Sequence, residues 1–336
     1  MLVFIKDFRP EQELTSYFLV VDKQVRLKKN GEPYLSLRLA DKTGQIDAKM
    51  WDKVAEVMDT FDRDDFVKAR GRVETYQQRP QFTIFQIRRA SETEVDPQDF
   101  FPVAERDPSA MFAELWEIIQ GIKNPHLRQL LEVTFQDEQI AAKFRRAPAG
   151  KTVHHAYLGG LLEHVLSLCR LCETVVKHYP FVDRDLMLAG AILHDIGKID
   201  ELSYERSFNY TDEGQLLGHI VIGVRIVEDK LRQVPGFPPR LRTLLEHMII
   251  SHQGELEFGS PKLPAFPEAL LLHYLDNLDS KMNNLENFLR GQSSTEGNWT
   301  AYNAPLERYL LRKDRYLDEE SAEAWDDEPD ASEGPS

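Results

Sequence analysis

Between residues 14 and 90, apolar and polar side chains alternate with a period of two, which is typical of half-buried β-strands. Turn residues interrupt the alternation at Lys28-Lys29-Asn30-Gly31 and at Asp41-Lys42-Thr43-Gly44. The pattern predicts five strands, at residues 16–27, 34–40, 45–51, 66–77 and 81–89. A short helix is predicted at residues 53–61, between the third strand and the fourth. This order of elements favours an all-β OB-fold barrel, a fold that often binds single-stranded nucleic acid.

The alternation also divides the strand residues between the barrel core and its outer surface. In the second strand, for example, Leu35, Leu37 and Leu39 share the face expected to point inward. The outward faces carry aromatic rings and cations: Tyr34, Arg38, Lys49, Trp51, Lys68, Arg70 and Arg72. Rings stack on bases and cations pair with phosphates, so we predict that these residues bind single-stranded nucleic acid. A solvated barrel face, or one packed on another domain, is the alternative.

After a polar, proline-bearing linker at residues 91–108, apolar positions recur at helical spacing. Helices are expected from about residue 109 to 143, broken near Asn124-Pro125, and again at residues 220–230, 239–251 and 267–289. Residues 203–217 are expected to form a hairpin, with its turn at Thr211-Asp212-Glu213-Gly214. The predicted architecture is multidomain, with a barrel at residues 1–90 and an all-α domain with a small β-hairpin insertion at residues 109–315.

Ionisable side chains interrupt the apolar helical runs, where an unpaired charge is costly. His194 and Asp195 end the run Ala191-Ile192-Leu193, and Gly197 is expected to let the chain turn at the helix end. A lone His-Asp pair is commonly structural, but further groups interrupt other runs: His164, His219, His247, His252, Asp276 and Asp279. One shared metal centre would satisfy them all, because imidazole and carboxylate together suit Mn, Fe or Zn.

The order His … His-Asp … Asp, with HDxGK at residues 194–198, resembles the signature of HD-domain phosphohydrolases. Four further segments look like the YhaM-type 3′-5′ exoribonuclease family: GGLLEH (159–164), GHI (218–220), SHQGELEFGSP (251–261) and LDNLDSK (275–281). That family also carries an OB-fold ahead of its HD domain, and the resemblance covers roughly residues 12–315. It implies that the helical domain is an HD domain.

The resemblance also implies roles for individual residues. Four match the ligands of the basic HD metal site: His164, His194, Asp195 and Asp276. Two match positions that bind a second ion in HD variants: His219 and His252. Lys198 matches a lysine assigned to phosphate contact in that family. The predicted catalytic residues are this lysine and the metal ligand Asp195. Gln253 stands where a second adjacent histidine is expected, which leaves one ion or two as open alternatives.

The expected cofactor is a divalent metal. The mixed ligands favour Mn²⁺, with Mg²⁺, Co²⁺ and Fe²⁺ as alternatives. Such ions lower the pKa of bound water and neutralise phosphate oxygens, while Lys198 would offset further charge there. Asp279 is expected to orient a ligand. His247 is a weaker candidate, for which the alternative is a satisfied interior histidine.

The net charge of −15 over 336 residues argues at first against a nucleic-acid partner. The charge is uneven, however, because residues 318–336 contain nine acids and no Lys or Arg. They belong to an expected disordered acidic tail at residues 316–336. Residues 1–90 carry seventeen basic and fourteen acidic residues, a net charge of +3. An anionic ligand is therefore expected on the N-terminal part.

Neither a signal peptide nor an apolar run of about 18 residues is found, so we expect a cytoplasmic protein without a membrane partner. Cys169 and Cys172 form a CxxC motif. Their helical spacing and the lack of a second such motif favour core positions over a zinc or redox site.

These features are compatible with three functions. The first is a metal-dependent 3′-5′ exoribonuclease that releases 5′-mononucleotides from single-stranded RNA, with single-stranded DNA as a further substrate. The second is a phosphohydrolase of small nucleotides or cyclic dinucleotides, and the third is a non-catalytic single-strand-binding protein with a structural metal. The barrel favours the first, because a small-nucleotide hydrolase has no use for a stacking platform. The resemblance also suggests a homo-oligomer.

Overall fold

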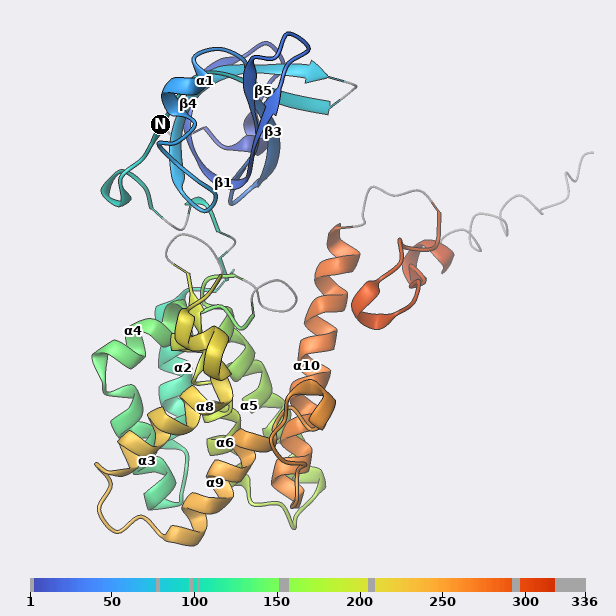
Figure 1. Ribbon diagram of the computed structural model, residues 1–336. Coiled ribbons are helices and arrows are strands. Elements are labelled where there is room, and N and C mark those ends of the chain that lie inside the picture. Colours follow the sequence, from blue (N-terminus) through green and yellow to red (C-terminus); the bar gives the residue numbers. More distant parts are fainter. Residues whose placement is uncertain are drawn as a thin grey trace, which may run out of the picture. The chain divides into compact units, whose positions relative to one another are not determined.

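The computed structural model of the chain describes residues 3–76, 79–96, 99–101, 103–104, 106–150, 157–204, 209–291 and 297–317. The predicted acidic tail lies, from residue 318 onward, outside the described residues. The chain divides into two compact units, Met1–Asp279 and Ser280–Ser336 (Figure 1). The first unit contains a β-barrel followed by a helical domain, and each is described by itself.

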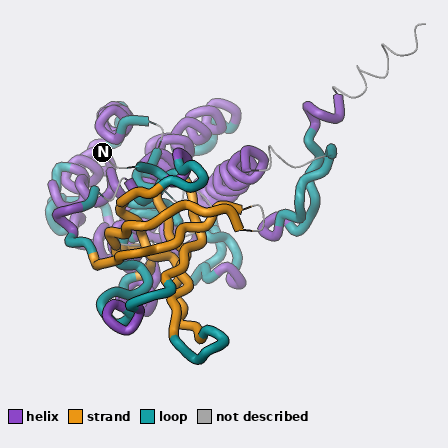
Figure 2. Tube along the Cα trace, turned by 90° about the horizontal axis from the view of Figure 1, so that it is seen from above, coloured by secondary structure: helices purple, strands orange, loops and turns teal. Residues whose placement is uncertain are grey.

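Five strands form a closed barrel in the order β1-β2-β3-β5-β4. They are β1 (Glu13–Leu27), β2 (Pro33–Asp41), β3 (Gly44–Met50), β4 (Phe66–Tyr76) and β5 (Arg79–Arg89). Figure 2 shows these strands crossing one another as they close the barrel. Neighbouring strands are antiparallel except for β3 and β5, which pair in parallel. The predicted OB-fold barrel is therefore confirmed.

The alternation correctly separated the barrel core from its surface. Leu35, Leu37 and Leu39 are at most 3% exposed, and the seven outward residues are all partly or fully exposed. The helix between the third and fourth strands is shorter than predicted, because α1 comprises only Val54–Val57. Phe61 at the end of the predicted helix is buried in the barrel core, and the chain leaves the helix before reaching it. Short 3₁₀ turns are η1 (Ile5–Asp7) and η2 (Glu92–Glu94).

The helical domain is built from nine described helices around one apolar core. They are α2 (Pro108–Gln120), α3 (Pro125–Phe135), α4 (Glu138–Arg146), α5 (Gly160–His178), α6 (Arg184–Leu193), α7 (Lys198–Glu201), α8 (Asp212–Leu231), α9 (Pro239–Ser251) and α10 (Pro267–Gly291). The predicted break at Asn124-Pro125 is confirmed, since the Asn124 side chain accepts the first backbone N–H groups of α3. Cys169 and Cys172 are buried core residues, as predicted, and burial raises the pKa of the Cys172 thiol to about 12.

The hairpin prediction is right about its existence and wrong about its extent. Among the described residues of this segment, β6 (Leu202–Ser203) pairs with β7 (Asn209–Tyr210), whereas the prediction ran to residue 217. Thr211 does not start a turn between strands but caps α8, because its Oγ1 accepts the Gly214 N–H at 2.9 Å. Gly218 has φ 71° and ψ 160° inside α8. This kink explains why the apolar pattern indicated a helix only from residue 220.

Helix α10 continues from the first unit into the second, which begins at Ser280. Beyond it, isolated bridges pair Trp299 with Leu311 and Asn303 with Arg308, around η5 (Ala304–Leu306). A further 3₁₀ turn, η4 (Leu256–Phe258), lies between α9 and α10. Within the described part of the chain, every helix is too short or too polar to cross a membrane.

Candidate metal centre and nucleic-acid groove

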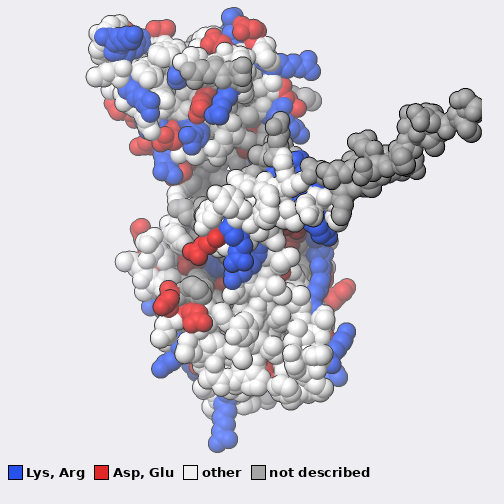
Figure 3. All heavy atoms as spheres, turned by 90° about the vertical axis from the view of Figure 1, so that its right-hand side faces the viewer, with Lys and Arg blue, Asp and Glu red and all other residues white. Residues whose placement is uncertain are grey.

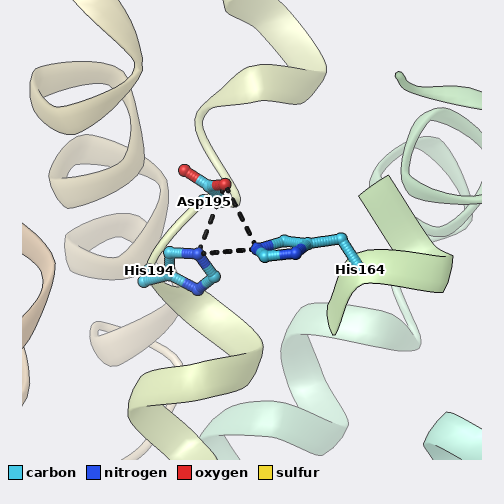
Figure 4. A group of neighbouring side chains, drawn as sticks. All are labelled: His164, His194 and Asp195. Carbon is cyan, nitrogen blue, oxygen red and sulfur yellow. Dashed lines mark hydrogen bonds and ion pairs between the residues drawn. The ribbon is translucent and has the colours of Figure 1, made fainter. Parts of the chain in front are cut away.

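The predicted metal ligands come from five places in the sequence and converge inside the helical domain. His164 lies on α5, His194 and Asp195 follow α6, His219 lies just after the kink in α8, His252 ends α9, and Asp276 lies on α10. His164, His194, Asp195 and His252 are at most 2% exposed. Figure 4 shows the rings of His164 and His194 pointing toward the Asp195 carboxylate.

The first cluster comprises His164, His194, Asp195 and Asp276. His164 Nε2 lies 3.4 Å from His194 Nε2 and 3.2 Å from Asp276 Oδ1. Asp195 Oδ2 lies 3.3 Å from His194 Nε2 and 4.0 Å from His164 Nε2. These separations allow one ion to contact His164, His194 and Asp195, and Asp276 Oδ1 adjoins both imidazoles. A set of two imidazoles and two carboxylates suits a divalent transition metal.

The second cluster uses the other oxygen of the same carboxylate. Asp195 Oδ1 lies 3.5 Å from His219 Nε2 and 3.6 Å from His252 Nε2, and these two nitrogens are 3.4 Å apart. Asp195 Oδ1 is buried and accepts no hydrogen bond from the described residues. An acceptor left in this state is costly, and a cation would satisfy it. Asp195 thus offers one oxygen to each cluster.

Hydrogen bonds on the far side of each ring determine where its lone pair points. The Nδ1 atoms of His194 and His252 lie 2.9 Å from Ala191 O and 2.6 Å from Ile249 O. A carbonyl only accepts, so each Nδ1 carries the proton, and Nε2 presents its lone pair to the cluster. The two imidazoles are therefore in the form that binds a metal.

Carboxylates orient the other two imidazole rings, those of His164 and His219. Asp279 Oδ2 accepts from His164 Nδ1 at 2.8 Å, and Ser167 donates a hydrogen bond to the other Asp279 oxygen. Glu201 Oε1 accepts from both Nδ1 and the backbone N–H of His219, at 3.0 and 2.8 Å. Asp279 therefore lies where an orienting carboxylate was expected. Glu201 was missed, because nothing in its spacing separates it from an ordinary helix-terminal acid.

The electrostatic field of the centre keeps its carboxylates ionised. Burial alone would raise the pKa of Asp195, but Lys198 Nζ, 2.6 Å from Oδ2, and the nearby histidines hold it well below its usual value. Burial lowers the pKa of His164, yet Asp276 and Asp279 outweigh this and raise it to about 9. Burial lowers the pKa of His252 to about 3. Binding of a cation at His164 would consequently displace a proton.

Two sequence interpretations change in the structure. Gly197 has φ −64°, so it makes no left-handed turn. It is required by close packing instead, because an added Cβ would lie 2.0 Å from the His219 backbone oxygen. His247 lies away from both clusters, and its Nε2 accepts the backbone N–H of Ala265 at 3.1 Å. This contact matches the alternative of a satisfied structural histidine.

Removing the carboxylate behind His164 should weaken metal binding without changing a ligand. We expect Asp279→Asn to reduce the affinity for Mn²⁺ by about 10- to 100-fold, because His164 loses the acceptor that orients it. Calorimetric titration with Mn²⁺ measures the change. Asp229→Asn is the matched control, since Asp229 is an exposed residue of α8 paired with Arg232. Equal affinities for the two variants would contradict the orienting role.

On the barrel, the structure brings together four of the seven predicted nucleic-acid-binding residues. Tyr34 and Trp51 stack with ring centres 4.7 Å apart, and Lys49 Nζ lies 5.6 Å from the Trp51 ring centre. Arg38 and Lys49 line a groove of about 610 Å³. The groove also contains one aromatic and two cationic residues that the sequence did not predict: Tyr76, Arg26 and Arg79. Asp22 and Asp47 line it too, so the groove is polar and not uniformly basic.

The other three residues lie on a different sector of the barrel. Lys68, Arg70 and Arg72 belong to β4, whose neighbours are β1 and β5, while Arg38 and Lys49 belong to the adjacent strands β2 and β3. Lys68 Nζ lies 5.0 Å from the ring centre of Tyr17 on β1. Arg72 pairs with Glu13 at 2.8 Å. Figure 3 shows cations and acids interspersed on one side of the barrel.

Comparison with known proteins agrees with this geometry. A family model described as HD domain matches residues 161–281, and one described as OB-fold nucleic acid binding domain matches residues 19–90. A 3′-5′ exoribonuclease YhaM from Geobacillus sp. is 38% identical over 279 residues, covering 83% of this chain and 85% of the relative. The protein of the same name from Bacillus subtilis is 37% identical, covering 83% and 88%. These matches confirm the resemblance drawn from the motifs.

Proposed function

Because the chain belongs to the YhaM family of 3′-5′ exoribonucleases, we propose that it hydrolyses single-stranded RNA from the 3′ end and releases 5′-mononucleotides. The observation that carries the proposal is the Asp195 carboxylate, whose two oxygens belong to two histidine clusters. A buried acceptor to which no described residue donates, and which adjoins two imidazole nitrogens, fits a cation better than a purely structural core.

The proposed cofactor is Mn²⁺, held by His164, His194, Asp195 and Asp276, with His219 and His252 available for a second ion. Divalent ions supply activated water and neutralise phosphate oxygens when they are bound. The residues around them orient the ligands and exclude bulk water. Lys198 Nζ lies 2.6 Å from Asp195 Oδ2, so its ammonium is placed to offset charge on a phosphate group.

The barrel groove is the proposed binding surface for the strand. Arg38 and Lys49 in the groove offer cations to phosphates. The stacked rings of Tyr34 and Trp51, which adjoin Lys49, offer ring faces to bases. RNA is the proposed substrate because the relatives are named exoribonucleases, and single-stranded DNA is the alternative. Homo-oligomerisation and a cytoplasmic location stay predictions.

Incubation of end-labelled RNA with the protein and Mn²⁺ tests the activity. We expect a ladder of products that shortens from the 3′ end and is absent when the metal is chelated. Intact RNA together with hydrolysis of small nucleotides or cyclic dinucleotides would instead support the second function. Retained RNA binding without turnover of either substrate would support the third, and nothing in the structure or the comparisons favours these two.

Substitution of two lysines on different sectors of the barrel tests which surface binds the nucleic acid. We expect Lys49→Ala to weaken binding of single-stranded RNA and to reduce the salt dependence by about one counterion, because Lys49 lies in the groove. Lys68→Ala is the matched variant on β4, and it should have a smaller effect. Fluorescence anisotropy at several salt concentrations measures both. The groove assignment is wrong if the Lys68 variant shows the larger loss.

A further inference from the structure

The Gln253 side chain directly follows His252 and points into the second cluster. Its amide Nε2 lies 3.4 Å from His219 Nε2 and 3.4 Å from His252 Nε2. The backbone around it is held in place: Gly254 has φ +79°, its N–H bonds to Ser251 O at 2.9 Å, and the Glu255 N–H bonds to Gln253 O at 3.0 Å. This turn therefore positions the amide beside the two imidazoles.

Four polar atoms then lie close together: the Nε2 atoms of His219 and His252, Asp195 Oδ1, and the Gln253 amide. The separations known among them are 3.4, 3.4, 3.4, 3.5 and 3.6 Å. A regular tetrahedron with such edges has its centre about 2.1–2.2 Å from each corner, close to the lengths of about 2.0–2.2 Å for bonds from Zn²⁺ to imidazole nitrogen and carboxylate oxygen. The five separations match the edges of a tetrahedral metal site, in which the amide would be the fourth corner.

The amide can fill this corner in two ways. With the NH₂ group inward, as the structure has it, it donates toward two imidazole lone pairs but leaves Asp195 Oδ1 without a donor. A half-turn of the amide puts its carbonyl oxygen inward, and this neutral oxygen is a metal ligand. A cation at the centre satisfies the two nitrogens, the carboxylate oxygen and the amide oxygen together.

We propose that the Gln253 amide oxygen is the fourth protein ligand of the second ion and strengthens its binding. The proposal rests on the proposed metal-dependent function, since it concerns an ion of the same centre. The two ions are then unlike: the second has four protein ligands, and five separations among them lie between 3.4 and 3.6 Å. The first cluster is less regular, with separations from 3.2 to 4.0 Å.

Titration of the full-length protein with Co²⁺ tests this, because the visible absorption of Co²⁺ is intense in tetrahedral sites and weak in six-coordinate ones. Wild type should bind two ions, one with the intense band. Gln253→Leu should reduce the affinity for that ion by about 10- to 100-fold and reduce the intensity of its absorption band. Gln253→Glu, which keeps an oxygen at the corner, should retain the band. Gln233→Leu, at an exposed glutamine, is the matched control.

An increase in metal affinity on removal of the amide would overturn the proposal. If the amide only donates to the imidazoles, it competes with the ion, and Gln253→Leu would then tighten the second site. Unchanged affinities and spectra in Gln253→Leu would also overturn it, and Gln253→Glu decides the matter if the leucine variant does not fold. The readout is metal binding and not RNA cleavage. A failure of the proposed nuclease function would be seen separately, because RNA would then stay intact in the presence of wild-type protein with two bound ions.

Discussion

Asp195→Ala is expected to lower the rate of RNA cleavage by at least about 10³-fold. Charge stabilisation by bound metal is worth several kcal/mol, and about 1.36 kcal/mol corresponds to each factor of ten in rate. The substitution removes one oxygen from each histidine cluster at once, because Oδ2 faces His194 and Oδ1 faces His219. Single-turnover assays with labelled RNA and saturating Mn²⁺ measure the loss.

Binding of RNA should survive in the same variant, since the barrel groove does not contain Asp195. Asp195→Asn provides a second test, because it keeps the shape of the side chain and removes its charge. The circular dichroism spectrum and the RNA affinity should remain close to those of the wild type for both variants. Full cleavage activity in either variant would show that the catalytic site lies elsewhere.

Gly197→Ala should cost stability and also disturb the second cluster. The added methyl group would lie 2.0 Å from the backbone oxygen of His219 and 2.6 Å from the backbone nitrogen of Gly223. Backbone atoms cannot give way as a flexible side chain can, so we expect the free energy of unfolding to fall by about 3 kcal/mol. His219 should move with the displaced part of α8 that follows the kink at Gly218, and binding of the second metal ion should weaken with it.

Urea denaturation of the Gly197 variant gives the stability change, and Gly44→Ala is the control. At Gly44 an added Cβ would meet only the Ile5 side chain, at 3.8 Å, so that substitution should change stability by no more than about 0.5 kcal/mol. If the Gly197 and Gly44 variants have equal stabilities, the close approach of α7 to α8 does not require glycine.

Local sequence patterns correctly predicted the helices and strands that are determined by local interactions. Alternation indicated all five strands, and helical spacing with prolines indicated α9 at its observed bounds, Pro239–Ser251. The start of α8 was misplaced, because capping by Thr211 and the kink at Gly218 break the apolar period without breaking the helix. Spacing alone could not reveal the close approach at Gly197, since that contact joins two segments brought together by packing.

The same limit applies to the functional surfaces. Alternation separates inside from outside but does not say where a strand lies around a closed barrel, so Lys68 and Arg38 were placed on one face. The histidines and aspartates of the metal centre were predictable because their motif resembles a known one. Glu201 and Tyr76 carry no such motif, and only the folded chain shows that they adjoin the centre and the groove.

The ligands of the metal centre are drawn from helices scattered between residues 164 and 276, so a bound ion joins segments that the chain itself leaves more than a hundred residues apart. Such an ion acts as a reversible cross-link, and its loss releases the ligands of its cluster in one event. Resistance to heat and to proteolysis would consequently rise and fall with the supply of free metal around the protein. A shortage of the ion would then lower the amount of folded enzyme as well as its turnover.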